Sequence, residues 1–275
     1  MENRNREASE AATAVARRFS MEGRRALVTG GSVSIGNAIS IALAEAGADV
    51  AIHHEDRADE AFGLPDAASE TASRVKALGR RAVLVDADFE RPGEAERTVR
   101  DAADALGGID VLVVCASIQY RTPFQDVTAE QLERQWRINF VATVELMQAA
   151  LPPMRERGWG RVLTIGSINE KRPEAELSIY AALKSAQHNL AINLARQYAD
   201  SGVTVNNLSP GLVATERNRW RRQDEASWNE IQRRSNPMGR AGTPEEIAAS
   251  ALLLCSDAGR FITGADLQVD GGHHL

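Results

Sequence analysis

Tyr180 and Lys184 are the residues of this chain whose types and spacing first suggest chemistry. They lie four positions apart, which on a helix places both side chains on one face, one turn apart. An ammonium group favours the phenolate form of a neighbouring phenol, so we expect this tyrosine to exchange a proton closer to neutral pH than a lone tyrosine does. Because the same spacing arises by chance in many helices, the pair needs support from the rest of the chain.

A glycine-rich segment near the N-terminus provides such support. Residues 29–38 follow a short apolar run at 26–28 and precede a periodic apolar segment that continues to Ala46, a pattern typical of strand, loop and helix. Glycines at positions 30 and 36 lack the Cβ that would keep a phosphate away from the backbone N–H groups and the helix N-terminus. The segment therefore predicts a binding site for a dinucleotide.

The rest of the chain alternates between apolar runs and amphipathic segments, which predicts one α/β domain with a doubly wound parallel sheet and helices on both faces. The expected strands are 24–29, 49–53, 82–86, 110–114, 161–165, 203–207 and 267–269. The expected helices are one that follows the glycine loop and ends at Ala46, then 66–78, 93–106, 128–150, 179–200 and one beginning near 244, with Pro152 and Pro153 ending the fourth. Residues 1–22 are expected to form a helical or disordered extension, residues 23–275 the domain.

Composition excludes several other functions. The 275 residues carry a formal net charge of −6, which argues against nucleic acid as a partner. We find no apolar run long enough to span a membrane and no signal peptide, so a cytoplasmic protein is expected. Two cysteines are too few for a disulfide framework, and adjacent histidines point apart on a strand, so no metal site is expected.

From about Arg24 to Gly272 the chain resembles the short-chain dehydrogenase/reductase family. Ser167 stands thirteen residues before Tyr180, as in that family, and the glycine loop and Asn139 occur in the family's order. Further matching segments are 87–89, 205–206, 210–215, 239–240, 244–246, 263–264 and 270–272. The resemblance implies a single-domain Rossmann-type fold and assembly as a homotetramer through the helices at 128–150 and 179–200.

The resemblance also implies roles for individual residues. Tyr180 would exchange a proton with the substrate oxygen, Lys184 would lower the tyrosine's pKa and hold the nicotinamide ribose, and Ser167 would hydrogen-bond the substrate oxygen. Asn139 would order a water leading from Lys184 to solvent. The residues expected to contact the cofactor are Gly30, Ser32, Ser34, Ile35, Gly36, His53, His54, Asp88, Phe89, Cys115, Ala116, Ser117, Tyr180, Lys184, Pro210, Gly211, Val213 and Thr215.

Three positions depart from the family pattern. Ser34 replaces the middle glycine of the loop, where its Cβ restricts the backbone. Residues 114–117, Val-Cys-Ala-Ser, replace Asn-Asn-Ala-Gly, so the usual asparagine contacts that brace this loop are lost, and Cys115 is expected to be a small buried thiol. Leu183 replaces the serine before the lysine.

The choice of cofactor depends on the end of the second strand. His54 stands where enzymes that use NAD usually carry a carboxylate, and His53, His54 or Arg57 could meet a phosphate, which favours NADP over NAD; Glu55 is the counterargument. Gln119, Asn169 and Trp220 are candidate substrate contacts.

The segment 212–240 corresponds to the family's substrate loop, and its arginines would meet an anionic substrate, an acidic carrier protein or solvent. The function that the resemblance implies is hydride transfer between a nicotinamide cofactor and a ketone or secondary alcohol, most like a 3-oxoacyl-carrier-protein reductase acting on a small or carrier-bound substrate. A sugar or polyol dehydrogenase is the alternative among enzymes, and a non-catalytic dinucleotide sensor the alternative of another class.

Overall fold

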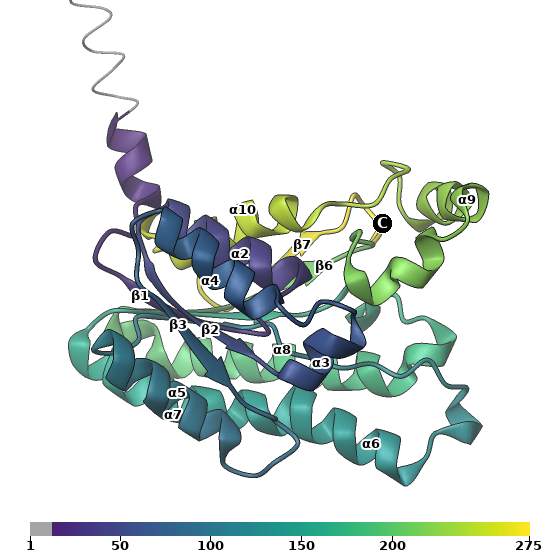
Figure 1. Ribbon diagram of the computed structural model, residues 1–275, viewed down its shortest axis with the longest axis horizontal. Coiled ribbons are helices and arrows are strands. Elements are labelled where there is room, and N and C mark those ends of the chain that lie inside the picture. The colour runs from purple at the N-terminus through teal and green to yellow at the C-terminus, as the bar shows by residue number, and fades with distance from the viewer. Residues whose placement is uncertain (1–12) are drawn as a thin grey trace, which may run out of the picture.

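The computed structural model describes residues 13–275, and its centre is a seven-stranded parallel sheet in the order β3-β2-β1-β4-β5-β6-β7 (Figure 1). The sequence-based prediction of a doubly wound parallel sheet is therefore confirmed. The strands are β1 (Arg25–Thr29), β2 (Asp49–His54), β3 (Ala82–Asp86), β4 (Val111–Val114), β5 (Gly160–Ile165), β6 (Val203–Pro210) and β7 (Asp266–Val269). The chain reverses its direction of travel across the sheet between β3 and β4, which leaves a crevice beside the carboxyl ends of β1 and β4.

Helices cover both faces of the sheet. Successive side chains of a strand point to opposite faces, and because these strands are apolar on both faces, each face has to be covered. In β1, Ala26 and Val28 pack into the core on one face and Leu27 into the core on the other. The first face is covered by α2 (Ser34–Glu45), α4 (Ala67–Ala77) and α10 (Pro244–Cys255), and the second by α5 (Glu94–Leu106), α7 (Ala142–Arg157) and α8 (Ser178–Tyr198) (Figure 1).

The helix predicted to stop before Pro152 and Pro153 does not stop there. The segment forms α6 (Ala129–Trp136), a π-helical turn η2 (Arg137–Val141) and then α7, which continues through both prolines to Arg157. The two prolines lie on the exposed side, where water can satisfy the carbonyl groups that they leave unpaired, while Leu151 and Met154 are buried in the core. Burial of the opposite side thus outweighs the local preference of proline.

Two regions predicted to be irregular contain helices. Residues 56–61 form α3 (Asp56–Ala61), which begins where the Glu55 carboxylate accepts the backbone N–H groups of Arg57 and Ala58. The expected substrate loop contains the 3₁₀ segment η6 (Glu216–Arg222) and α9 (Glu225–Ser235). Both regions follow carboxyl ends of strands (Figure 1), and residues of both line a cavity at that edge of the sheet.

The predicted N-terminal extension lies partly outside the described residues, which begin at residue 13. Residues 13–19 are helical and largely exposed. Met21, by contrast, is fully buried and its backbone N–H donates to the Ala46 carbonyl at 2.7 Å.

Candidate active site

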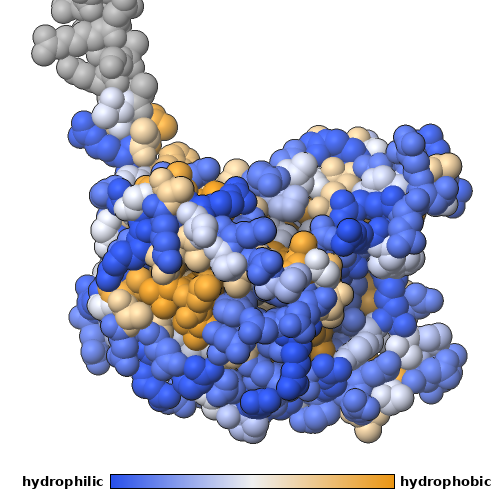
Figure 2. All heavy atoms as spheres, in the orientation of Figure 1, coloured by the Kyte–Doolittle hydropathy of each residue, from blue (hydrophilic) through white to orange (hydrophobic). Residues whose placement is uncertain are grey.

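A cavity of about 600 Å³ lies at the carboxyl ends of the central strands, and it gathers the residues that sequence reasoning selected. All of the predicted cofactor contacts line it, together with Ser167 and the candidate substrate residues Gln119, Asn169 and Trp220. Figure 2 shows the hollow beneath the segment that carries α9, with hydrophobic atoms inside a hydrophilic rim. Asn139 is the exception among the predicted site residues, because it is fully buried and does not line the cavity.

The glycine loop has the tight shape that a pyrophosphate requires. A Cβ on Gly36 would lie 1.9 Å from the Gly30 carbonyl oxygen, so only glycine fits there. No side chain caps the first turn of α2, and that turn contains no acidic residue. Free backbone N–H groups at a helix N-terminus attract anions, so the loop and α2 fit the phosphates of a dinucleotide.

Ser34, which stands at a position where the family pattern has glycine, adopts a left-handed backbone conformation with φ of +53°. This left-handed conformation is unfavourable for a residue with a Cβ. The Ser34 hydroxyl accepts the Glu216 backbone N–H at 3.2 Å, which attaches the start of η6 to the glycine loop. The substitution therefore links the cofactor loop to the substrate loop.

Both ring nitrogens of His53 form hydrogen bonds with backbone groups in the interior of the fold. Its Nδ1 accepts the Gly30 backbone N–H at 3.0 Å, and its Nε2 therefore carries the proton and donates to the Ala87 carbonyl at 3.0 Å. The ring is buried and stacks on Phe89 with centroids 4.1 Å apart. Burial lowers the pKa of His53 to about 4, so the ring is neutral at neutral pH. Because both ring nitrogens of His53 bond to the backbone, His54 and Arg57 are the two of the three candidate phosphate contacts whose side chains are not held in this way.

The end of β2 carries charges of both signs. His54 lies beside Asp56, with Nδ1 and Oδ1 3.0 Å apart, and Arg57 is exposed at the cavity wall. Glu55, which sequence reasoning weighed as a ribose ligand, caps α3 instead. Sequence reasoning missed Asp59, which α3 turns into the interior, where its carboxylate accepts the Ser32 hydroxyl at 2.9 Å. Burial raises the pKa of Asp59.

Ser167 begins the short 3₁₀ turn η3 (Ile168–Glu170), and its hydroxyl is oriented by Asn169. The Ser167 Oγ accepts the Asn169 backbone N–H at 3.1 Å and its side-chain Nδ2 at 3.2 Å. Since these bonds use the oxygen's lone pairs, the hydroxyl proton is free to donate toward the Tyr180 phenol. Asn169 thus contacts Ser167 directly, a role that sequence reasoning did not assign to it.

Tyr180 and Lys184 lie on the buried face of α8, as their spacing predicts. Burial raises the pKa of Tyr180 above its ordinary value of 10, although the Arg217 charge and the hydrogen bond to Ser167 act in the opposite direction. The expectation of a lowered tyrosine pKa is therefore wrong for this structure, since desolvation dominates. Burial also lowers the pKa of Lys184 to about 8.

The Lys184 ammonium is held by two acceptors. Its Nζ donates to the Ile165 carbonyl at 2.6 Å and to Gln187 Oε1 at 3.1 Å, and it lies 5.8 Å from the centroid of the Tyr180 ring. The Gln187 amide in turn donates to Thr143 Oγ1 at 2.8 Å and to the Asn139 carbonyl at 3.4 Å. Gln187, which sequence reasoning missed, connects the lysine of α8 to the π-helical turn η2.

The loop after β4 is braced despite the missing asparagines. The Thr29 hydroxyl oxygen accepts the backbone N–H groups of Cys115 and Ala116, at 3.0 and 3.1 Å. The Asn139 amide clamps Ile118, accepting its N–H and donating to its carbonyl, both at 2.8 Å. Asn139 therefore positions the loop through its side chain. Burial raises the pKa of Cys115, as expected for an inert thiol.

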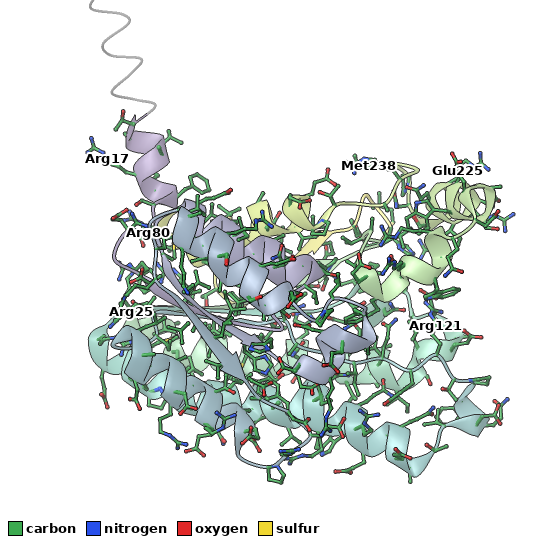
Figure 3. The ribbon with its side chains drawn as sticks, in the orientation of Figure 1. Arg17, Arg25, Arg80, Arg121, Glu225 and Met238 are labelled. Carbon is green, nitrogen blue, oxygen red and sulfur yellow. The ribbon has the colours of Figure 1, made fainter. Side chains whose placement is uncertain are left out.

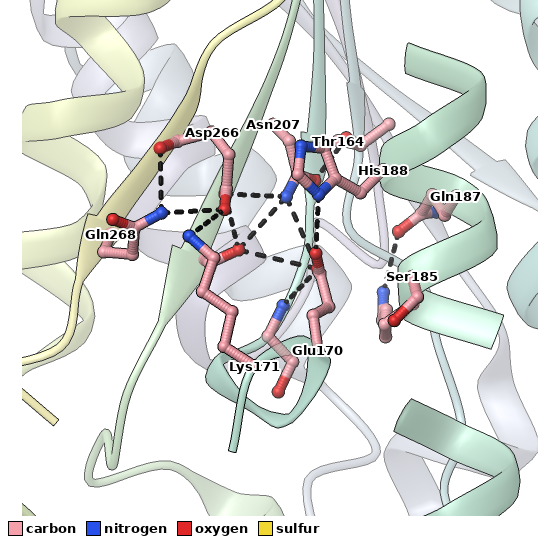
Figure 4. A network of polar contacts seen from close by, with 12 residues as sticks. Thr164, Glu170, Lys171, Ser185, Gln187, His188, Asn207, Asp266 and Gln268 are labelled. Carbon is pink, nitrogen blue, oxygen red and sulfur yellow. Dashed lines mark hydrogen bonds and ion pairs between the residues drawn. The ribbon is translucent and has the colours of Figure 1, made fainter. Parts of the chain in front are cut away.

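A network of polar contacts joins Glu170, Lys171, His188 and Asp266 (Figure 4). Glu170 Oε1 accepts the Ser167 backbone N–H at 3.0 Å, and Glu170 Oε2 lies 2.9 Å from His188 Nδ1. Burial and the nearby Asp266 charge raise the pKa of Glu170, while Asp266 pairs with Lys171 at 2.9 Å. Potential ligand atoms of Glu170, His188 and Asp266 lie within 4.8 Å of one another, but the Lys171 ammonium already supplies a positive charge there.

The substrate side of the cavity is lined by charged residues of the loops. Glu174 lies between Arg121 and Arg221, at 2.6 and 3.2 Å, and Figure 3 shows Arg121 between the α9 segment and α6. Trp220 is 57% exposed at the rim, so it is accessible to a substrate or a partner. His273, from the C-terminal histidine pair that lies far away in sequence, also lines the cavity.

Known proteins share both the sequence pattern and this architecture. A family model described as enoyl-(acyl carrier protein) reductase matches residues 30–274. The chain is 32% identical to D-beta-hydroxybutyrate dehydrogenase of Rhizobium meliloti, over 90% of this chain and 98% of that protein. It belongs to the short-chain dehydrogenase/reductase family.

Other relatives of this short-chain dehydrogenase/reductase differ in substrate. The chain is 32% identical to L-rhamnose 1-dehydrogenase (NAD(P)(+)) of a Sphingomonas species, over 93% of this chain and 98% of that protein. A crystal structure of 3-oxoacyl (acyl-carrier-protein) reductase from Agrobacterium tumefaciens with NADP bound superimposes with a TM-score of 0.87 at 41% identity, covering 94% of this chain and 96% of that one.

The protein is an oxidoreductase of the NAD(P)-dependent type, so the alternative of a non-catalytic sensor is not supported. Within residues 13–275, every helix is too short or too polar to cross a membrane.

Proposed function

We propose that this enzyme reduces a ketone to a secondary alcohol, or catalyses the reverse oxidation, with NADP(H) as cofactor and Tyr180 as the proton donor. The observation that carries the proposal is the arrangement of Ser167 and Tyr180. Asn169 occupies the lone pairs of the Ser167 hydroxyl, so its proton is free to donate to a substrate oxygen beside the phenol, and burial keeps Tyr180 protonated at neutral pH. A buried, protonated phenol next to a hydroxyl donor suits reduction of a carbonyl group.

Each polar group of the site has a proposed task. When bound, the nicotinamide supplies or accepts the hydride. Ser167 donates a hydrogen bond to the substrate oxygen, Tyr180 Oη transfers its proton to that oxygen, and Lys184 stabilises the negative charge that develops on the phenol. The Ile165 carbonyl and Gln187 keep the ammonium in place. Asn139 shapes this region through Ile118 and, as the family pattern implies, would order a water near Lys184.

NADP is proposed over NAD because His54 and Arg57 border the cavity at the end of β2 and the structural relative from Agrobacterium tumefaciens holds NADP. Asp59 is the carboxylate that would repel a 2′-phosphate. Because burial raises the pKa of Asp59, protonating this carboxylate and so removing its charge costs less free energy. The glycine loop, the uncapped α2 and residues 210–215 would hold the remainder of the dinucleotide.

For the substrate, we propose a small or acyl-type ketone rather than a sugar. The arginines of η6 and the resemblance to a 3-oxoacyl reductase support the ketone, whereas Gln119 and the relative that oxidises rhamnose support the sugar. Assembly as a homotetramer through α7 and α8, a cytoplasmic location and a carrier-bound acyl substrate remain expectations from the sequence.

Tyr180→Phe tests the proposal directly. The purified variant is assayed by nicotinamide absorbance against panels of ketones, acyl thioesters and sugars with both cofactors. We expect turnover to fall at least about a hundredfold, the usual scale of general acid catalysis, while NADPH affinity stays within about threefold. Turnover near the wild-type rate would refute the mechanism. Tyr198→Phe, at the far end of α8, serves as the matched control.

A further inference from the structure

Arg217 reaches from η6 across the cavity to the loop after β4. Its Nη2 donates to the Ser117 carbonyl at 2.5 Å and to the Ser117 hydroxyl at 3.1 Å. The side chain lines the same cavity as Ser167, Tyr180 and Lys184. A guanidinium group from the substrate loop therefore lies in the same cavity as the reacting groups.

Among residues 13–275, no carboxylate forms an ion pair with Arg217. Its neighbours on η6 are paired: Arg219 and Arg222 lie 3.7 and 3.5 Å from Glu216, and Arg221 shares Glu174 with Arg121. Within residues 13–275, Arg217 has only the neutral oxygens of Ser117 as partners. A cation that is partly withdrawn from water without an anionic partner costs stability, which is typical of a residue kept for a ligand.

The charge of Arg217 acts on the groups that share its cavity. Its charge lowers the pKa of Tyr180, Lys184 and Cys115, although burial has the larger effect on each of the three groups. The geometry agrees, because Arg217 and the reacting groups line one cavity. An anion held by this guanidinium would share that cavity with a carbonyl group placed at Ser167 and Tyr180.

We propose that Arg217 binds a carboxylate of the substrate, so that the enzyme acts on short oxo acids and the corresponding hydroxy acids. The guanidinium fork matches a carboxylate, and its charged hydrogen bonds are stronger than the present bonds to the Ser117 oxygens. This inference rests on the proposed function, because it names the substrate class of the same site. A neutral sugar or ketone would leave the cation without an ionic partner.

Arg217→Met, compared with Arg219→Met, tests the assignment. Arg219 stands on the same 3₁₀ segment but is exposed and does not line the cavity, so it is the matched control. The probes are acetoacetate and 2-oxobutyrate, each paired with its uncharged methyl ester. We expect wild type and Arg219→Met to prefer the acids, and Arg217→Met to lose about 10- to 100-fold in kcat/KM for the acids while the esters change less than about threefold. Arg217→Lys should restore part of the preference.

Affinity for NADPH, measured by its fluorescence in the same variants, separates a substrate ligand from a cofactor ligand. The proposal is wrong if Arg217→Met weakens NADPH binding and reduces the rates with acid and ester equally, because Arg217 would then bind the cofactor. It is also wrong if wild type neither binds nor reduces either acid, or treats acid and ester alike. In those cases the proposed function survives if another ketone or a sugar is turned over in a manner that depends on Tyr180.

Discussion

His53 fixes the glycine loop by accepting the Gly30 backbone N–H at its Nδ1, 3.0 Å away. The same ring donates to the Ala87 carbonyl, so one side chain joins the cofactor loop to the segment that follows β3. Protonation of Nδ1 would remove the acceptor and leave a buried N–H without a partner. The neutral ring is therefore a requirement for the shape of the loop.

His53→Leu should destabilise the protein by about 1–3 kcal/mol and weaken NADPH binding, because the Gly30 N–H loses its acceptor. Urea unfolding and nucleotide fluorescence measure the two effects. His53→Gln, whose amide can both accept and donate, should lose less. The unfolded ring takes up a proton near pH 6.5 and the native ring near pH 4, so the wild-type advantage over His53→Leu should shrink as pH falls through that window. An advantage independent of pH would contradict this assignment.

Lys184 should make the free energy of unfolding depend on pH in the alkaline range. Its pKa is about 8 in the native protein and ordinarily 10.5, so between these values the unfolded chain binds more protons than the native protein. Stability of wild type relative to Lys184→Met should therefore rise by about 3 kcal/mol between pH 8 and 10.5. Urea unfolding of both proteins across this range checks the prediction, and a constant difference would mean that the native lysine titrates normally.

Asn169 should act on the rate rather than on substrate affinity, because it orients the Ser167 hydroxyl. Asn169→Ala removes the donor at 3.2 Å but keeps the backbone N–H, so we expect kcat to fall by about tenfold with little change in KM. Steady-state kinetics with any ketone that is turned over will show the split. A rise in KM alone would assign Asn169 to substrate binding, as sequence reasoning supposed.

Asp59 should weaken the binding of NADP relative to NAD. Its buried carboxylate accepts the Ser32 hydroxyl, and it lines the same end of the cavity as His54 and Arg57. Asp59→Asn removes the negative charge and keeps the shape, so the ratio of NADP to NAD affinity should rise by about three- to tenfold. Titration calorimetry with both nucleotides measures the ratio. Glu60→Gln, on the exposed side of α3, is the control and should leave the ratio unchanged.

The sequence was sufficient for features that depend on neighbouring residues along the chain. Apolar runs specified the strands and their alternation with helices, and the spacing of four placed Tyr180 and Lys184 on one buried face of α8. Glycine at position 36 could be assigned to the cofactor loop because a residue without a Cβ lets a phosphate approach the backbone. Such properties are local, so a linear pattern can report them.

Only the tertiary structure decided features that depend on contacts across the chain. The turn of α3 brings Asp59 to Ser32, and η6 carries Arg217 to Ser117, a hundred positions away in sequence. The helix α7 continues past its two prolines because Leu151 and Met154 on the opposite side are buried in the core. The protonation of Tyr180 likewise depends on how completely the fold excludes water, because desolvation raises its pKa by more than the Arg217 charge lowers it. Burial and long-range pairing arise only when distant segments meet, which is why residue types and spacing alone did not reveal them.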